Sequence, residues 1–203
     1  MAKGNQEFFW RRLHSLLGVL PVGLFLTMHL MINHTATRGE EAYNAATEFM
    51  GSLPFLLFLE FTIIYIPILF HAIYGVYIAF TAKNNVHRYG TFRNWMFVFQ
   101  RITGIFLIIF ISWHVWETRI AKAFGQEVNF DMMANIVDNP VMLAFYIIGI
   151  TSATFHLANG LWSFCVSWGI TVSPRSQKVF TYISMIFFLA LSYIGISAIL
   201  AFV

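Results

Sequence analysis

Histidines are the residues of this 203-residue chain best suited to bind a metal, and four of its seven recur at a fixed spacing. His71 and His156 each follow a phenylalanine, precede a glycine by four residues and are separated by 85 residues. His29 and His114 are separated by the same 85 residues. This spacing predicts an internal duplication whose repeated element is a histidine pair. The same separation joins two further pairs of identical residues, Trp10 with Trp95 and Asn44 with Asn129.

The composition indicates that these histidines lie in a membrane. Apolar residues make up 59% of the chain and charged residues only 10%, whereas a soluble domain carries about 25% charged residues. The single cysteine, Cys165, excludes an intrachain disulfide, a cysteine-ligated iron–sulfur cluster and a tetrathiolate zinc site. Without a C-x-x-C-H motif, covalent c-type haem attachment is excluded as well. The net charge of +3 comes from basic residues scattered between apolar runs, which favours a role in membrane topology over nucleic-acid binding.

Five apolar stretches are long enough to cross a bilayer, which takes about 20 helical residues. They predict one all-α integral membrane domain over residues 1–203, a bundle of five transmembrane helices. Pro21 and Pro67 fall inside spans and predict mild kinks. The expected spans are residues 13–32, 53–82, 95–116, 141–169 and 179–203.

Lysine and arginine are enriched in cytoplasmic loops, so their placement predicts orientation. Nine of the twelve lie on one side of the five spans, namely Lys3, Arg11, Arg12, Lys83, Arg88, Arg93, Arg101, Arg175 and Lys178. The other three are Arg38, Arg119 and Lys122. We therefore expect a cytoplasmic N-terminus and an external C-terminus.

The helical rise predicts two levels of histidines. His71 and His156 lie about 17–20 Å from the cytoplasmic ends of their spans, and His29 and His114 about 24–28 Å. Ionisable groups inside a bilayer are expensive and usually functional. Two facing histidines at one depth supply the two axial ligands of a haem iron. We expect the bundle to enclose two b-type haems, one held by His71 and His156 and one, nearer the outside, by His29 and His114.

Four glycines support this interpretation. Gly75 and Gly160 lie one turn past their histidines, and Gly18 and Gly104 lie close to three turns before His29 and His114, on the histidine face. We expect all four to leave room for flat haem rings.

Helix packing and zinc binding stay open as alternative roles for the repeated histidines. Histidines and glycines in membrane helices also serve packing, and zinc is a rival metal, although neither level offers a cysteine or carboxylate to complete a tetrahedral site. Four histidines in two depth-matched pairs favour haem. The remaining histidines, His14, His34 and His87, lie at span ends or in loops, where we expect interfacial or solvated roles.

Several short motifs resemble one family. The run Arg12-Leu13-His14-Ser15-x-x-Gly18, the four spaced histidines and Asn159-Gly160-Leu161-Trp162 resemble the diheme cytochrome b membrane anchors of succinate dehydrogenase, of the single-chain, five-helix type found in menaquinone-using bacteria. The resemblance extends over essentially the whole chain.

The resemblance implies an anchor in the bacterial cytoplasmic membrane for a flavoprotein and an iron–sulfur subunit. Electrons from succinate would pass through FAD and the iron–sulfur clusters of those partners to a proximal haem at His71 and His156. They would continue to a distal haem at His29 and His114, and then to menaquinone.

The quinone and propionate contacts are less specific in sequence. Glu60 is the only acid well inside a span, where it would either deliver protons to quinone near the distal haem or join two helices by a hydrogen bond. A cluster at the cytoplasmic side would bind haem propionates, because arginine pairs well with carboxylates, or a quinone. Its members are Arg12, His14, Ser15, Arg101 and Thr103.

Three alternative functions remain at the level of sequence. The same scaffold run in reverse would anchor a fumarate reductase, since direction depends on redox potentials. A cytochrome b anchor of a hydrogenase or formate dehydrogenase would have a different partner enzyme. A haem-free transporter would use the histidines as a proton relay.

Overall fold

A computed structural model describes residues 3–203, and every regular element in that range is a helix. The long helices are α1 (Lys3–Val19), α2 (Pro21–Asn33), α5 (Ile66–Thr81), α6 (Phe92–Val115), α9 (Pro140–Ser167) and α10 (Pro174–Leu200). The shorter α-helices are α3 (Glu40–Gly51), α4 (Leu56–Leu59), α7 (Ala121–Ala123) and α8 (Phe130–Val137). A 3-10 helix, η1 (His34–Arg38), and two π-helices, η2 (Glu60–Tyr65) and η3 (Trp116–Ile120), complete the set.

Five continuous helical units within the described residues are long and apolar enough to span a membrane, which confirms the predicted fold class. They are Gly4–Arg38, Leu56–Thr81, Phe92–Ala123, Pro140–Ser167 and Pro174–Leu200. Several of these helices run past the predicted apolar stretches, because a helix does not have to stop where its apolar residues stop.

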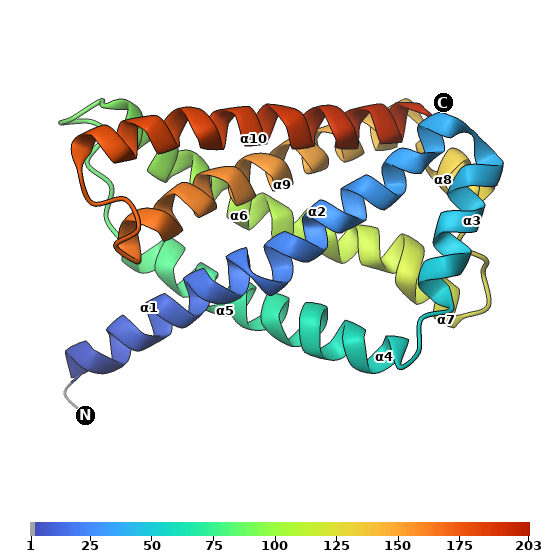
Figure 1. Cartoon of the computed structure of the whole chain (residues 1–203), viewed down its shortest axis with the longest axis horizontal. Coiled ribbons are helices and arrows are strands. Elements are labelled where there is room, and N and C mark those ends of the chain that lie inside the picture. Colours follow the sequence, from blue (N-terminus) through green and yellow to red (C-terminus); the bar gives the residue numbers. More distant parts are fainter. Residues whose placement is uncertain (1–2) are drawn as a thin grey trace.

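The five units run lengthwise beside one another (Figure 1). Helices α3, α7 and α8 gather with the C-terminus at one end, here named the α3/α8 end (Figure 1). The loops formed by residues 82–91 and 168–173 lie at the opposite end, here named the loop end, and the N-terminus points the same way (Figure 1).

Both predicted proline positions coincide with irregular backbone. Pro21 has no N–H to donate, so the first unit is interrupted at Leu20 before α2 begins. Pro67 lies in the first turn of α5, directly after the π-helix η2. The missing proline N–H therefore falls where the backbone pattern already changes from π to α.

Polar side chains set the starts of four helices. The side chains of Thr91, Asn129, Asn139 and Ser173 accept hydrogen bonds from backbone N–H groups in the first turns of α6, α8, α9 and α10. These N–H groups have no partner within the helix, so each cap satisfies one of them. Asn44, which shares the 85-residue offset with Asn129, accepts from Phe130 N at 2.8 Å and joins α3 to α8.

Helix α9 is the centre of the bundle and packs against α1, α6 and α10. Its Thr154 is fully buried and its hydroxyl lies 2.7 Å from that of Ser192 on α10. Inside an apolar bundle such a hydrogen bond satisfies two polar groups at once. Helix α9 carries His156 and packs against α6, which carries His114, while α5, which carries His71, packs against α1.

Candidate functional site: two histidine pairs

The structure brings the four repeated histidines together as two pairs. The rings of His71 on α5 and His156 on α9 have centroids 6.1 Å apart at 86°. Those of His29 on α2 and His114 on α6 are 5.8 Å apart at 71°. Because metal–imidazole bonds are about 2 Å long, two imidazoles that face one metal from opposite sides have centroids about 6 Å apart. Each pair thus has the separation needed to hold one metal ion.

The two pairs lie at different heights. Gly104 faces His156 and precedes His114 by ten residues on α6, a rise of about 15 Å. Gly18 faces His71 and precedes His29 by eleven residues along the first unit. The pair of His71 and His156 lies nearer the loop end, and the other pair lies nearer the α3/α8 end.

In the pair nearer the loop end, both Nδ1 atoms have partners. His71 Nδ1 donates to the backbone carbonyl of His14 at 3.0 Å. His156 Nδ1 lies 3.2 Å from the hydroxyl of Thr103, which donates its own proton to backbone carbonyls of α6 and so accepts from the imidazole. A proton fixed on Nδ1 leaves the Nε2 lone pair free for a metal, which is the usual arrangement of metal-binding histidines.

In the other pair, the two histidines have unlike partners. His114 Nδ1 lies 3.3 Å from the hydroxyl of Tyr146, which in turn donates to Glu117 at 3.2 Å. The amide nitrogen of Asn33 lies 3.5 Å from both ring nitrogens of His29, and the same amide donates to His29 O at 2.7 Å.

Two of the predicted glycines lie directly against the histidine rings. A Cβ on Gly18 would overlap the His71 ring, and one on Gly104 would lie 3.0 Å from His156 Cε1. These glycines therefore make room for an imidazole of the neighbouring helix, which is a closer neighbour than the haem ring that the sequence suggested.

The other two glycines face side chains from α1 and α6. A Cβ on Gly75 would lie 3.2 Å from His14 Nε2, and one on Gly160 would lie 3.4 Å from Gln100 Nε2. His14 and Gln100 occupy matching places in the two halves of the repeat. The α1–α5 and α6–α9 crossings are thus built alike, with one glycine on each helix.

The predicted cytoplasmic cluster is only partly assembled around the histidines. The His14 ring stacks on His71 with centroids 4.0 Å apart, and its Nε2 is buried with no hydrogen-bond partner. Ser15 is half-buried next to it. Arg101 instead donates to Ala82 O at the end of α5, while its Nε is buried and unpartnered.

Other cationic and histidine side chains lie farther out. The Arg12 guanidinium lies over the Trp168 ring at 5.0 Å, at the end of α9. His34 Nδ1 lies 3.0 Å from the Ser197 hydroxyl and so ties η1 to α10. His87 is exposed in the loop between α5 and α6.

Glu60 forms a bidentate ion pair that joins the two π-helices. Arg119 Nε and Nη2 donate to the two Glu60 carboxylate oxygens at 2.9 and 2.8 Å. The Glu60 side chain is 13% exposed and that of Arg119 is 33% exposed. This contact gives Glu60 a role in joining helices, and its role toward quinone stays a prediction.

The sequence assigned no role in the site to Gln100, Asn159 or Tyr146, although Asn159 belongs to a motif that carries the resemblance. Gln100 Nε2 donates to His156 O at 3.0 Å, and Asn159 Nδ2 donates to Gln100 Oε1 at 2.7 Å. The offset of 86 residues that joins His14 to Gln100 and Gly18 to Gly104 could have identified Gln100. No comparable signal marks Tyr146.

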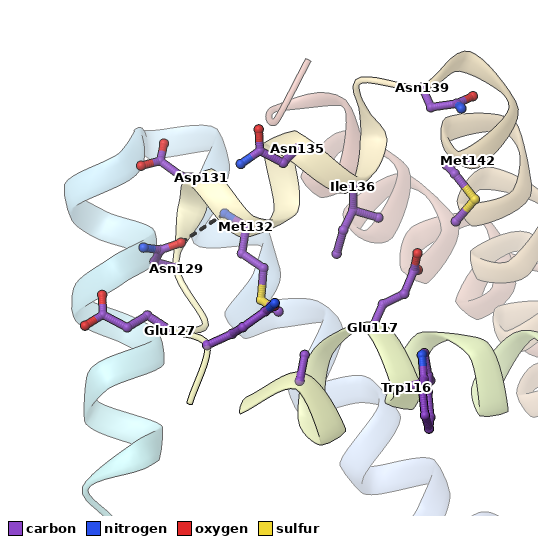
Figure 2. Close-up of a pocket in the computed structure, with 12 residues that line it drawn as sticks. Trp116, Glu117, Glu127, Asn129, Asp131, Met132, Asn135, Ile136, Asn139 and Met142 are labelled. Carbon is purple, nitrogen blue, oxygen red and sulfur yellow. Dashed lines mark hydrogen bonds between the residues drawn. The ribbon is translucent and has the colours of Figure 1, made fainter. Parts of the chain in front are cut away.

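Two pockets flank the site. One of about 790 Å³ opens at the α3/α8 end, where Glu117 points from η3 toward Ile136 and Met142 (Figure 2). The other, of about 460 Å³, lies at the loop end and is lined by residues that include Lys83, Arg93, Gln100, Asn159 and Trp162.

Comparison with known proteins agrees with this architecture. Residues 81–196 match the family described as succinate dehydrogenase/fumarate reductase transmembrane subunit. The chain is 64% identical, over 98% of its length and 99% of the relative's, to the succinate dehydrogenase cytochrome b558 subunit of Bacillus subtilis. It is 33% identical, over 39% of its length and 62% of the relative's, to the succinate dehydrogenase hydrophobic membrane anchor subunit of Thermoplasma acidophilum.

These matches leave no basis for the hydrogenase-anchor and transporter alternatives. They agree with the resemblance in family and, for the Bacillus subtilis subunit, in overall length. The chain belongs to the family of succinate dehydrogenase/fumarate reductase transmembrane subunits and is a membrane-anchor subunit of succinate dehydrogenase.

Proposed function

We propose that this subunit holds two b-type haems in series and so carries electrons across the bilayer from an iron–sulfur partner to menaquinone. The observation that carries the proposal is the pair of imidazole separations, 6.1 and 5.8 Å, at two heights of one bundle. The name of the Bacillus subtilis relative, a cytochrome b558 subunit, supports haem b as the group.

The donor set fits haem better than zinc. Each level offers two facing imidazoles, and no group of three or more histidine, cysteine, aspartate or glutamate side chains suited to a metal occurs within residues 3–203. A haem b bound by two imidazoles supplies a one-electron carrier. His71 and His156 would hold the proximal haem, and His29 and His114 the distal one.

Unpartnered polar atoms near the loop end fit haem propionates. His14 Nε2 and Arg101 Nε are both buried without a hydrogen-bond partner. A carboxylate would satisfy both, because it accepts from imidazole and guanidinium N–H groups. Arg12, Ser15 and Thr103 lie on the same helices α1 and α6, although Thr103 already accepts from His156.

The proposal places the loop end in the cytoplasm of a bacterial cell. Most basic residues lie at that end, which agrees with the distribution of charge in membrane proteins. The flavoprotein and iron–sulfur subunits, with their FAD and iron–sulfur clusters, would bind there, close to His71 and His156. Succinate oxidation takes place on those partners, and this chain contributes anchoring and menaquinone reduction.

Menaquinone would bind near the α3/α8 end, where Glu60 and Arg119 lie. The guanidinium can donate a hydrogen bond to a quinone oxygen, and the carboxylate can hold a proton for it. The family also contains fumarate reductase subunits. The names of both relatives favour the direction of succinate oxidation.

The test is a haem count on purified complexes. The unmodified complex should show two b-type haems per chain in the dithionite-reduced minus oxidised spectrum. His71→Ala and His29→Ala should each remove one haem, whereas His87→Ala, in an exposed loop, should retain both. Two haems in either pair variant would show that the ligand assignment is wrong, and no b-type absorption in the unmodified complex would refute the proposal.

A further inference from the structure

A chain of hydrogen bonds connects one histidine to a carboxylate at the α3/α8 end. The Tyr146 hydroxyl lies 3.2 Å from Glu117 Oε2 and 3.3 Å from His114 Nδ1. A carboxylate only accepts hydrogen bonds, so the single O–H of Tyr146 points to Glu117. The tyrosine oxygen is then left to accept from the N–H of His114. The order of donation is His114 to Tyr146 to Glu117.

Packing holds the middle of this chain in place. Tyr146 on α9 is 3% exposed. The Phe110 ring lies 5.5 Å from Tyr146 at 83° and 6.0 Å from His114 at 13°. A Cβ on Gly149 would overlap the Phe110 ring, so glycine is needed at that position for α6 and α9 to approach. The phenol therefore has little freedom to turn away from the imidazole.

Glu117 differs from the other two members because it reaches an opening. It lies in η3 and forms part of the wall of the 790 Å³ pocket (Figure 2). A π-helical turn re-aims the side chains that follow it, and such turns are frequent at functional sites. Here the turn directs Glu117 toward Tyr146, across from α6 to α9.

The described partners of the other three histidines carry no charge. His71 donates to a backbone carbonyl, and His156 lies beside a threonine hydroxyl. His29 is approached by the amide of Asn33. Within the described part of the chain, His114 is the member of the four that is linked to a carboxylate.

We propose that Tyr146 and Glu117 are positioning residues that lower the reduction potential of the centre bound by His29 and His114. This inference rests on the proposed haem ligation. Negative charge delivered through a hydrogen bond to the far side of a ligating imidazole makes that ligand more basic. A more basic ligand stabilises the oxidised iron relative to the reduced iron, and hydrogen bonding around the ligands is one of the protein's means of setting potential.

The test is a redox titration of the purified complex that follows the two centres separately. Tyr146→Phe removes the hydrogen bond while it keeps the ring. It should shift the oxidised-to-reduced equilibrium of one centre about tenfold toward the reduced form, a change as large as the smaller effects that such outer residues have on metal affinity or activity. For a one-electron couple this is about 59 mV. Glu117→Gln should shift the same centre in the same direction by less, and the other centre should not move.

Glu127→Gln is the matched control, because Glu127 lines the same pocket and is exposed. It should leave both potentials unchanged. An equal shift in Glu127→Gln would overturn the proposal, since pocket charge alone would then account for the effect. Low-temperature electron paramagnetic resonance spectra should show that each centre keeps two imidazole ligands in every variant. This result would distinguish a change in reduction potential from the loss of a ligand.

The outcomes also separate this inference from the proposed function. An unmodified complex without two b-type centres refutes haem ligation itself. Two centres whose potentials do not move in Tyr146→Phe and Glu117→Gln overturn only the tuning role. If Tyr146→Phe loses a haem, the Glu117→Gln variant provides the test, because it retains the phenol and its packing. A shift in the potential of the centre bound by His29 and His114 then supports the proposal, and an unchanged potential overturns it.

Discussion

At the scale of single residues, the Nδ1 atoms matter most in the two histidine pairs, because their hydrogen-bond partners orient the imidazoles. Three of the four imidazoles have an Nδ1 partner within 3.3 Å, from a backbone carbonyl, a threonine or a tyrosine. Such partners fix the tautomer before any metal binds. Residue type and spacing predicted the histidines, but hydrogen-bond partners depend on which helices cross, and this the sequence does not state.

Gly18→Ala tests how tightly the α1–α5 crossing is built. The new Cβ would overlap the His71 ring, so either the helices separate or the imidazole turns. We expect a loss of about 1–3 kcal/mol in stability, as is typical of overpacking, with a reduced content of one haem. Thermal unfolding in detergent and the haem-to-protein ratio measure both effects. Gly4→Ala is the control, because nothing lies within 4 Å of its Cβ position; equal behaviour of the two variants would contradict the prediction.

At the scale of elements, the two π-helices have a shared role. Helices η2 and η3 lie at the α3/α8 ends of the second and third units, and the Glu60–Arg119 ion pair joins them. Hydropathy predicted the five long units, because an apolar run of sufficient length has few alternatives in lipid. It did not predict the π turns, the pairing of Glu60 with Arg119 or the position of Tyr146, since all three depend on contacts between distant segments.

A double-mutant cycle separates the structural and chemical roles of Glu60. Arg119→Met leaves a carboxylate largely out of water without its partner, and we expect it to destabilise the protein by about 1.5–3 kcal/mol. The double variant Glu60→Gln/Arg119→Met should recover most of that loss, because no unpaired charge remains. Thermal unfolding measures each step.

The same double variant also tests the proposed role of Glu60 as a proton donor. If the roles proposed for Glu60 and Arg119 at the quinone are correct, the double variant should fold normally, retain two haems and yet reduce menaquinone slowly; Glu60→Gln alone should then show the share that belongs to the carboxylate. Normal menaquinone reduction in this stable double variant would leave Glu60 with the structural role alone.

Helix α3 carries a titratable group outside the spans. Tyr43 is 2% exposed, and burial raises its pKa to about 12 from the usual 10. The folded state therefore keeps a proton that the unfolded state releases. This stabilises the fold fully below pH 10 and is lost as pH rises through about 12, a difference of roughly 3 kcal/mol. Tyr43→Phe should weaken the alkaline loss of helical circular dichroism; an unchanged pH profile would show that other groups cause it.

At the scale of the whole molecule, the internal duplication explains how the helices and histidines are arranged better than any single motif does. The α1–α5 and α6–α9 crossings each place a glycine against a histidine ring, at Gly18 and Gly104. The two halves differ beside the histidine pair nearer the loop end, where His14 in one half corresponds to Gln100 in the other. The 85-residue repeat can be recognised in the sequence. The correspondence of His14 with Gln100 was missed because the offset there is 86 residues.

Orientation in the membrane yields the last prediction. Asn85 and Gln126 are exposed at the loop end and the α3/α8 end, while the single native cysteine, Cys165, is 5% exposed. With Cys165→Ser as background, a membrane-impermeant maleimide applied to intact cells should label Gln126→Cys and not Asn85→Cys. The physical reason is that nine of the twelve lysines and arginines lie on the side of the loop end and three on the other side, and the side richer in these residues stays in the cytoplasm. Denaturation in detergent should then expose both cysteines equally, which controls for protein amount and for cover by partner subunits. Labelling of Asn85→Cys from outside would invert the topology and move the His71–His156 pair away from the side where electrons are proposed to enter.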